Sequence, residues 1–182
     1  MKVGLLADTH SNKPDGSDLP DEVLRAFRGV DLIVHLGDVG RKGILDRLGD
    51  VAPVWVPYGD DKGYVPHLAR DDDPAKVLAD GALGLTFDLT KPDKKIAVTQ
   101  GAPTTIGYAD GALPALLQRR FKSDVRVVAF GGTHVAHSEE RDGVLFVKPG
   151  SPTLPSDGPT GSVAVVDLSA KKPKAKLVRL KG

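Results

Sequence analysis

The strongest constraint on the fold is a series of short apolar runs, each of which ends in a polar or glycine-containing turn. The runs occupy residues 3–7, 32–36, 54–56, 96–98 and 125–130. They are rich in valine and isoleucine, and this pattern predicts strands buried on both faces of a sheet. Segments with helical spacing of apolar residues lie between them, at residues 20–28, 44–48 and 113–121. Alternating strands and helices predict an α/β protein in which helices cover a sheet.

The last third of the chain predicts antiparallel pairing. Residues 144–147 follow Asp142-Gly143, a dipeptide typical of two-residue hairpin turns. Residues 162–168 and 175–180 predict a second hairpin. The sheet therefore becomes mixed. From Ser169 onward the chain has six basic residues and no acidic one, which is typical of an edge strand protected by lysines and is also compatible with a weak site for an anionic partner.

Composition excludes several classes of protein. The 182 residues fit one domain, which we expect to span residues 1–182, and 40% hydrophobic content is enough for a core. A net charge of +1 argues against a broad nucleic-acid or membrane-surface footprint. The absence of cysteine excludes disulfides, thiol nucleophiles and thiolate metal sites. No apolar run reaches the ~20 residues of a membrane span, and no signal peptide is evident, so we expect a cytoplasmic protein.

A polar turn follows each predicted strand. These turns are Asp8-Thr9-His10, Gly37-Asp38, Gly59-Asp60-Asp61, Gln100-Gly101 and Gly131-Gly132-Thr133-His134. Parallel strands bring such turns to one edge of a sheet, where open α/β proteins build their sites. Five turns in this register predict that their Asp and His side chains converge, although any one of them alone is equally typical of a capping aspartate or a surface histidine.

Converging carboxylates and imidazoles predict a metal site. Asp and His together suit Mn²⁺, Fe²⁺ or Zn²⁺. If Asp8, Asp38, Asp60 and Asp61 share one crevice, their mutual repulsion raises their pKa values unless a cation neutralises them. The sequence therefore predicts at least one bound divalent ion.

The ordered motifs, followed by Lys148-Pro149-Gly150-Ser151-Pro152, resemble those of the calcineurin-like metallophosphoesterases. The closest match in length is the small bacterial and archaeal phosphodiesterase branch, which also contains the phosphoesterase-like scaffold subunit of retromer. The resemblance covers essentially the whole chain. It implies a four-layer α/β/β/α sandwich of two mixed sheets flanked by helices, and hydrolysis of phosphomonoesters or phosphodiesters by a metal-bound water between two ions.

The resemblance also implies a first metal site that is complete. In the family, this site takes the Asp and His of the opening motif, a bridging Asp and the last His of a Gly-His-Thr-His motif. The corresponding residues of this chain are Asp8, His10, Asp38 and His134. All four residue types match, so we expect this site to bind an ion.

The second metal site departs from the family pattern. Where relatives carry an asparagine and two histidines, this chain has Asp60, Gln100 and Gly132. Asp60 is a competent ligand, Gln100 offers a weak neutral carbonyl, and Gly132 has no side chain. Asp61 occupies the position of a general-acid histidine in many relatives, and it can replace that acid only if its pKa is raised toward neutrality. We therefore expect a weakened second site.

The sequence leaves two classes of function open. The first is a metal-dependent phosphoesterase acting on a small phosphate ester. The second is a non-catalytic scaffold or metal-binding interaction protein on the same fold, including a regulatory module; self-association into a homo-oligomer also stays open. Among the remaining histidines, His35 lies within an apolar strand and is expected in the core, whereas His137 either points away from the site or compensates for Gly132.

Overall fold

The computed structural model describes residues 1–56, 86–88, 95–99, 125–169 and 172–181. The elements in chain order are β1 (Lys2–Leu6), α1 (Asp21–Ala26), β2 (Leu32–His35), α2 (Gly43–Gly49), β3 (Val54–Trp55), β4 (Thr86–Asp88), β5 (Lys95–Thr99), β6 (Val125–Phe130), β7 (Ala136–Arg141), β8 (Val144–Pro149), β9 (Ser162–Asp167) and β10 (Lys174–Arg179). The five strand runs and two of the three helices predicted from the sequence are present. The third predicted helix, at residues 113–121, lies outside the described residues.

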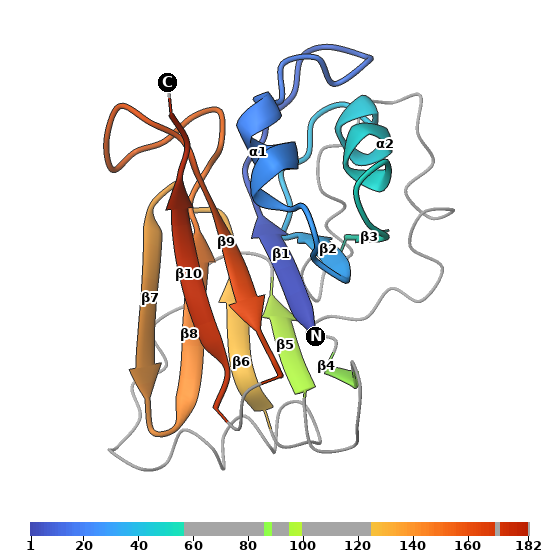
Figure 1. The fold of residues 1–182 in the computed structure, drawn as a ribbon. Helices are drawn as coiled ribbons and strands as arrows, with labels where there is room; N and C mark the ends of the chain where they lie inside the picture. The colour runs from blue at the N-terminus through green and yellow to red at the C-terminus, as the bar shows by residue number, and fades with distance from the viewer. Residues whose placement is uncertain (57–85, 89–94, 100–124, 170–171, 182) are drawn as a thin grey trace, which may run out of the picture.

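The strands form two mixed sheets, as the sequence and the resemblance predict (Figure 1). The first has the order β10-β9-β1-β2-β3 and the second the order β4-β5-β6-β8-β7. In the first sheet β1, β2 and β3 are parallel, and β9 and β10 are added antiparallel. In the second, β5, β6 and β8 are parallel, with β4 and β7 antiparallel to their neighbours. Each sheet therefore has a group of parallel strands whose carboxyl ends lie at one edge.

The two sheets pack face to face, and α1 and α2 cover the outer face of the first sheet. Successive side chains of β1 divide between these two layers: Val3 and Leu5 lie in the apolar cluster shared with the second sheet, whereas Leu6 lies in the cluster shared with the helices. Gly4, on the helix side, leaves room for the ring of Phe27, which is fully buried. Burial on both faces explains why β1 is a continuous apolar run rather than an alternating one.

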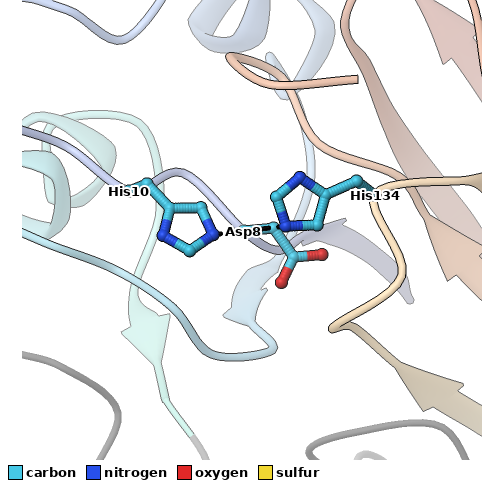
Figure 2. Close-up of side chains that lie close together, drawn as sticks. All are labelled: Asp8, His10 and His134. Atoms are coloured by element: carbon cyan, nitrogen blue, oxygen red, sulfur yellow. Dashed lines mark hydrogen bonds between the residues drawn. The ribbon is translucent and has the colours of Figure 1, made fainter. Parts of the chain in front are cut away.

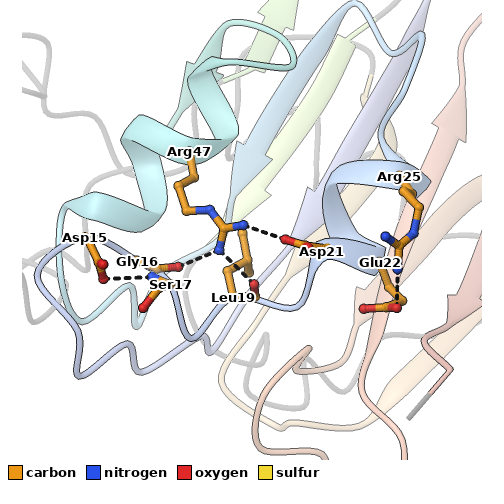
Figure 3. A network of polar contacts seen from close by, with 8 residues as sticks. All are labelled: Asp15, Gly16, Ser17, Leu19, Asp21, Glu22, Arg25 and Arg47. Atoms are coloured by element: carbon orange, nitrogen blue, oxygen red, sulfur yellow. Dashed lines mark hydrogen bonds and ion pairs between the residues drawn. The ribbon is translucent and has the colours of Figure 1, made fainter.

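The two helices are short and are fixed by polar contacts as well as by packing. α1 begins after Pro20 and has Asp21 and Glu22 in its first turn, where acidic side chains suit the helix dipole. Arg47 of α2 donates hydrogen bonds to the carbonyl oxygens of Gly16 and Leu19 at 2.9 Å each, and to the carboxylate of Asp21 (Figure 3). This network attaches α2 to the connection between β1 and α1, the same connection that carries the first candidate site residues.

The antiparallel elements confirm the turn chemistry read from the sequence. Asp142 and Gly143, at φ of 50° and 75°, form the tight turn between β7 and β8. β10 lies at the edge of the first sheet and exposes Lys174 and Lys176, as expected for a protected edge.

Within the described part of the chain, no helix is long and apolar enough to cross a membrane.

Candidate metal centre

Three of the predicted polar turns meet at one end of the two sheets. Asp8, Thr9 and His10 follow β1 directly, and Gly37 and Asp38 follow β2 after one further residue. These two turns continue side by side beyond the strands: the Asp8 amide donates to the Gly37 carbonyl at 3.0 Å, and the His10 amide to the Asp38 carbonyl at 2.9 Å. The third turn follows β6 and brings His134 from the second sheet. The convergence therefore depends on how the two sheets pack, and not only on parallel neighbours within one sheet.

Asp8, His10 and His134 form a cluster of potential metal ligands (Figure 2). One ligand atom from each residue lies within 4.8 Å of the others. The Nε2 atoms of His10 and His134 are 3.2 Å apart, and the ring centroids are 5.1 Å apart. Two imidazole nitrogens that share a tetrahedral ion at about 2.0–2.1 Å would be separated by about 3.3–3.4 Å. The spacing of the two rings thus fits a common divalent cation.

The backbone at this cluster is held in an unusual conformation. Asp8, His10, Asp38 and His134 have φ of 55°, 43°, 51° and 55°, in the left-handed region. Among the described non-glycine residues, one further residue shares it, the turn residue Asp142. Such backbone costs of order 1–3 kcal/mol per residue and is concentrated at functional sites. Within the described ranges, the four residues that the resemblance assigns to the first metal site are therefore the non-glycine residues that adopt this strained backbone outside a hairpin turn.

Asp8 is the buried member of the cluster, with 1% of its surface exposed. The amide of Gly132 donates to both of its carboxylate oxygens at 2.9 Å. Burial raises the pKa of Asp8 above its usual value; the Gly132 amide and the charge of His134 oppose this shift, whereas the nearby charge of Asp38 adds to it. Burial makes ionisation of the Asp8 carboxyl group unfavourable, and a bound cation would stabilise its charged form.

The remaining predicted ligands have different outcomes. Asp38 is half-buried beside the cluster, and its carbonyl accepts from the His10 amide, but its carboxylate is not part of the three-residue group. Its role as a bridging ligand stays a prediction. Asp60, Asp61 and Gln100 lie outside the described residues.

The other two histidines that the structure describes, His35 and His137, are not part of the cluster. His35 is fully buried, which confirms its assignment to the core. Its Nδ1 accepts from the Gly37 amide at 3.3 Å, so its Nε2 carries the proton and donates to Thr9 Oγ1 at 2.8 Å. Burial lowers the pKa of His35 to about 3, and the charge of His10 adds to the effect. His137 is exposed on β7, where its Nε2 lies 3.8 Å from Glu139, and it does not replace the side chain missing at Gly132.

The structure also reveals contributors that the sequence reading missed. Gly132 acts through its amide rather than through a side chain, and its φ of 87° suits glycine. The carbonyl of Leu154 accepts a hydrogen bond from Nδ1 of His134 at 2.7 Å. Backbone atoms are common to all residues, so no sequence signal marks them. Ser151, whose hydroxyl accepts from the Leu154 amide, belongs to the Gly150-Ser151-Pro152 motif, but the motif alone predicts no role for it.

The domain model of the calcineurin-like phosphoesterase superfamily matches residues 1–171. The chain belongs to this superfamily. A relative from Methanocaldococcus jannaschii, named a probable metallophosphoesterase, is 33% identical over 155 residues, which cover 85% of this chain and 70% of that protein.

Two solved structures show the same fold. Vps29 of Entamoeba histolytica, crystallised with Zn²⁺, has a TM-score of 0.60 at 22% identity, with 98% of this chain and 99% of that chain covered. An archaeal phosphodiesterase has a TM-score of 0.61 at 19% identity, with coverage of 98% and 100%. At these identities the likeness establishes the architecture, and the residues of the site must carry the argument about activity.

Proposed function

We propose that this protein is a metal-dependent phosphoesterase that hydrolyses a small phosphomonoester or phosphodiester. The observation that carries the proposal is the convergence of Asp8, His10 and His134, from two different sheets, on a volume the size of a metal coordination sphere. Family membership supports phosphate esters as the substrate class. The absence of cysteine and the small net charge support a cytoplasmic protein without specific nucleic-acid binding.

The first ion would be held by Asp8, His10 and His134, with Asp38 as the bridging ligand. This mixed oxygen and nitrogen donor set suits Mn²⁺, Fe²⁺ or Zn²⁺. A divalent ion there supplies Lewis acidity, which lowers the pKa of water and stabilises charge that develops on phosphoryl oxygens. The chain's own part is to fix the ligands: strained backbone aims them, and the Gly132 amide orients the Asp8 carboxylate.

The second ion would be held weakly, by Asp60 and Gln100 together with the bridging Asp38. Relatives place a histidine where this chain has Gly132, whose amide is already engaged by Asp8. We therefore propose one tightly bound ion and a second that binds weakly or with the substrate. Asp61 is the proposed general acid for the leaving group.

Hydrolysis of chromogenic esters tests the proposal directly. Purified protein loaded with Mn²⁺ should hydrolyse bis(p-nitrophenyl) phosphate or p-nitrophenyl phosphate, and Asp38→Ala, prepared in parallel, is the control for contaminating phosphatases. Metal analysis of protein purified without chelator should find about one equivalent of Mn, Fe or Zn, the number expected if only the first site is complete. Activity equal to that of Asp38→Ala would exclude a catalytic role.

Gly132 favours a second candidate, a non-catalytic scaffold or metal-binding interaction protein, because the chain lacks a side-chain ligand at this position. The double substitution Gln100→His with Gly132→His separates the two candidates. Activity that arises only in the double variant identifies a site that has lost catalysis, whereas activity in the parent supports the phosphoesterase. A scaffold should also keep its partner binding after the metal is removed.

A further inference from the structure

The segment that follows β8 contacts two of the three ligand-bearing turns, although it supplies no proposed ligand itself. Residues 151–157 lie between the end of β8 at Pro149 and the start of β9 at Ser162. Hydrogen bonds from this segment reach the turn after β1 and the turn after β6. One short segment thus joins the parts of the site that come from different sheets.

The hydroxyl of Ser151 is the centre of this connection. It donates to the carbonyl oxygen of Asp8 at 2.7 Å and accepts from the amide of Leu154 at 2.8 Å. The residue has no exposed surface, so water cannot replace either contact in the folded protein. The hydroxyl of Thr153 makes a parallel contact by donating to the carbonyl oxygen of Thr9 at 2.7 Å. Two hydroxyl groups therefore hold the segment against the backbone of the first ligand turn.

The same segment determines the orientation of His134. A carbonyl oxygen only accepts, so the 2.7 Å contact with the Leu154 carbonyl places the proton of the neutral ring on Nδ1. The lone pair then lies on Nε2, the atom that faces His10. The amide of Ser156 also donates to the His134 carbonyl at 3.0 Å. The backbone of residues 154–156 thus fixes both the main chain and the ring of this ligand.

The far end of the segment is attached independently. The Asp157 carboxylate accepts from the Ala136 amide at 2.8 Å and from both terminal nitrogens of Arg179 at 2.9 and 2.6 Å. The hydrogen bond from Arg179 is the main cause that lowers the pKa of Asp157 to about 2. The segment is therefore secured at its far end as well as at Ser151, and this fixes the Leu154 carbonyl between the two attachments.

We propose that Ser151 and Thr153 are positioning residues of the metal site, which hold the Leu154 carbonyl where it selects the tautomer and direction of His134. The inference rests on the proposed function only in that it requires an ion at Asp8, His10 and His134. Mutation of residues that orient metal ligands without touching the metal typically lowers metal affinity or activity by about 10–100-fold. They act by limiting the geometries that a ligand can adopt.

Ser151→Ala, compared with Ser162→Ala, tests the proposal. Ser162 is also a fully buried serine with one donated side-chain hydrogen bond, to the Pro149 carbonyl at 2.8 Å, but its hydroxyl does not contact a ligand turn. The first measurement is the affinity for Mn²⁺ by calorimetry. We expect Ser151→Ala to bind about 10–100-fold more weakly than the wild type, and Ser162→Ala to retain wild-type affinity even if it is equally destabilised.

The second measurement is made without metal. Imidazole ¹⁵N chemical shifts, recorded at alkaline pH, should show His134 as the Nδ1–H tautomer in the wild type and in Ser162→Ala. Ser151→Ala should shift His134 toward the Nε2–H tautomer. Thr153→Val, which loses the contact with Thr9, should change both readouts in the same direction, and it serves as the test variant if Ser151→Ala does not fold.

The outcomes separate this inference from the proposed function. A wild-type protein that binds no divalent ion would refute the metal site, and with it the role of the two hydroxyls in metal binding. A wild type that binds an ion, with affinity and His134 tautomer unchanged in Ser151→Ala and Thr153→Val, would overturn the positioning role alone. Equal loss of affinity in Ser162→Ala would also overturn it, because the effect would then be general destabilisation.

Discussion

Replacing Asp8 with asparagine should strongly weaken metal binding without destabilising the metal-free protein. The pKa of Asp8 is raised by burial, so the folded protein holds this proton more tightly than the unfolded chain does. Stability is therefore lost as the pH rises from the usual value of 3.8 through the raised value, and the loss persists at neutral pH. Asparagine has no charge to bury, and its side-chain oxygen can still accept from the Gly132 amide.

The metal-dependent part of the prediction can be given a magnitude. An ion that binds only the folded state stabilises it by about 2.7 kcal/mol at a concentration of 100 Kd. For a chain of 182 residues this raises Tm by about 5–11 °C, at about 2–4 °C per kcal/mol. If loss of the Asp8 charge weakens binding about 100-fold, the same ion concentration equals Kd and stabilises by about 0.4 kcal/mol, a shift of about 1–2 °C.

The assay is thermal unfolding at pH 7.5 with and without Mn²⁺, with Asp46→Asn as a matched control. Asp46 lies exposed on α2, so its replacement changes the net charge equally without altering the site. We expect metal-free Asp8→Asn to melt at or above the wild-type temperature and to lose most of the Mn²⁺ shift, which Asp46→Asn should keep. A metal-free Asp8→Asn that melts several degrees below Asp46→Asn, or that keeps the full Mn²⁺ shift, would refute the reasoning.

Two further predictions concern the core. A Cβ at Gly4 would lie 2.8 Å from Cδ1 of the buried Phe27 ring, so Gly4→Ala should lower the free energy of unfolding in urea by about 1–3 kcal/mol. Gly49→Ala is the control, because nothing lies within 4 Å of a Cβ there, and it should cost no stability. Equal stability of the two variants would contradict the prediction. Burial lowers the pKa of His35 to about 3, so on acidification this imidazole is protonated in the unfolded chain before it is protonated in the folded protein. The free energy of unfolding should therefore decrease as the pH drops under about 6.5, by up to about 1.4 kcal/mol per pH unit. Urea unfolding between pH 4.5 and 6.5 should show a shallower pH dependence for His35→Gln, and an unchanged slope would argue against a neutral His35.

Local chemistry made the strands and turns predictable. In the run Val125–Phe130 every residue except Arg126 is apolar, which favours a buried strand. The turn at Asp142 and Gly143 depends on the backbone preferences of two adjacent residues. The hairpin of β9 and β10 was predictable for the same reason, because its two strands are neighbours in the sequence. The limits of α1, Asp21–Ala26, were predicted less closely, at residues 20–28, because helix ends depend on packing and capping as well as on apolar spacing.

The sequence by itself determined which residues are available as ligands, because Asp8, His10 and His134 have the side chains that a divalent ion requires and follow predicted strands. Only the tertiary structure decided that they meet: β1 and β6 belong to different sheets, and the shared apolar core that brings the sheets together depends on contacts between residues more than a hundred positions apart. The groups that orient these ligands were beyond the sequence for a different reason. The Gly132 amide and the Leu154 carbonyl are backbone atoms, which every residue possesses, so their function comes from position alone.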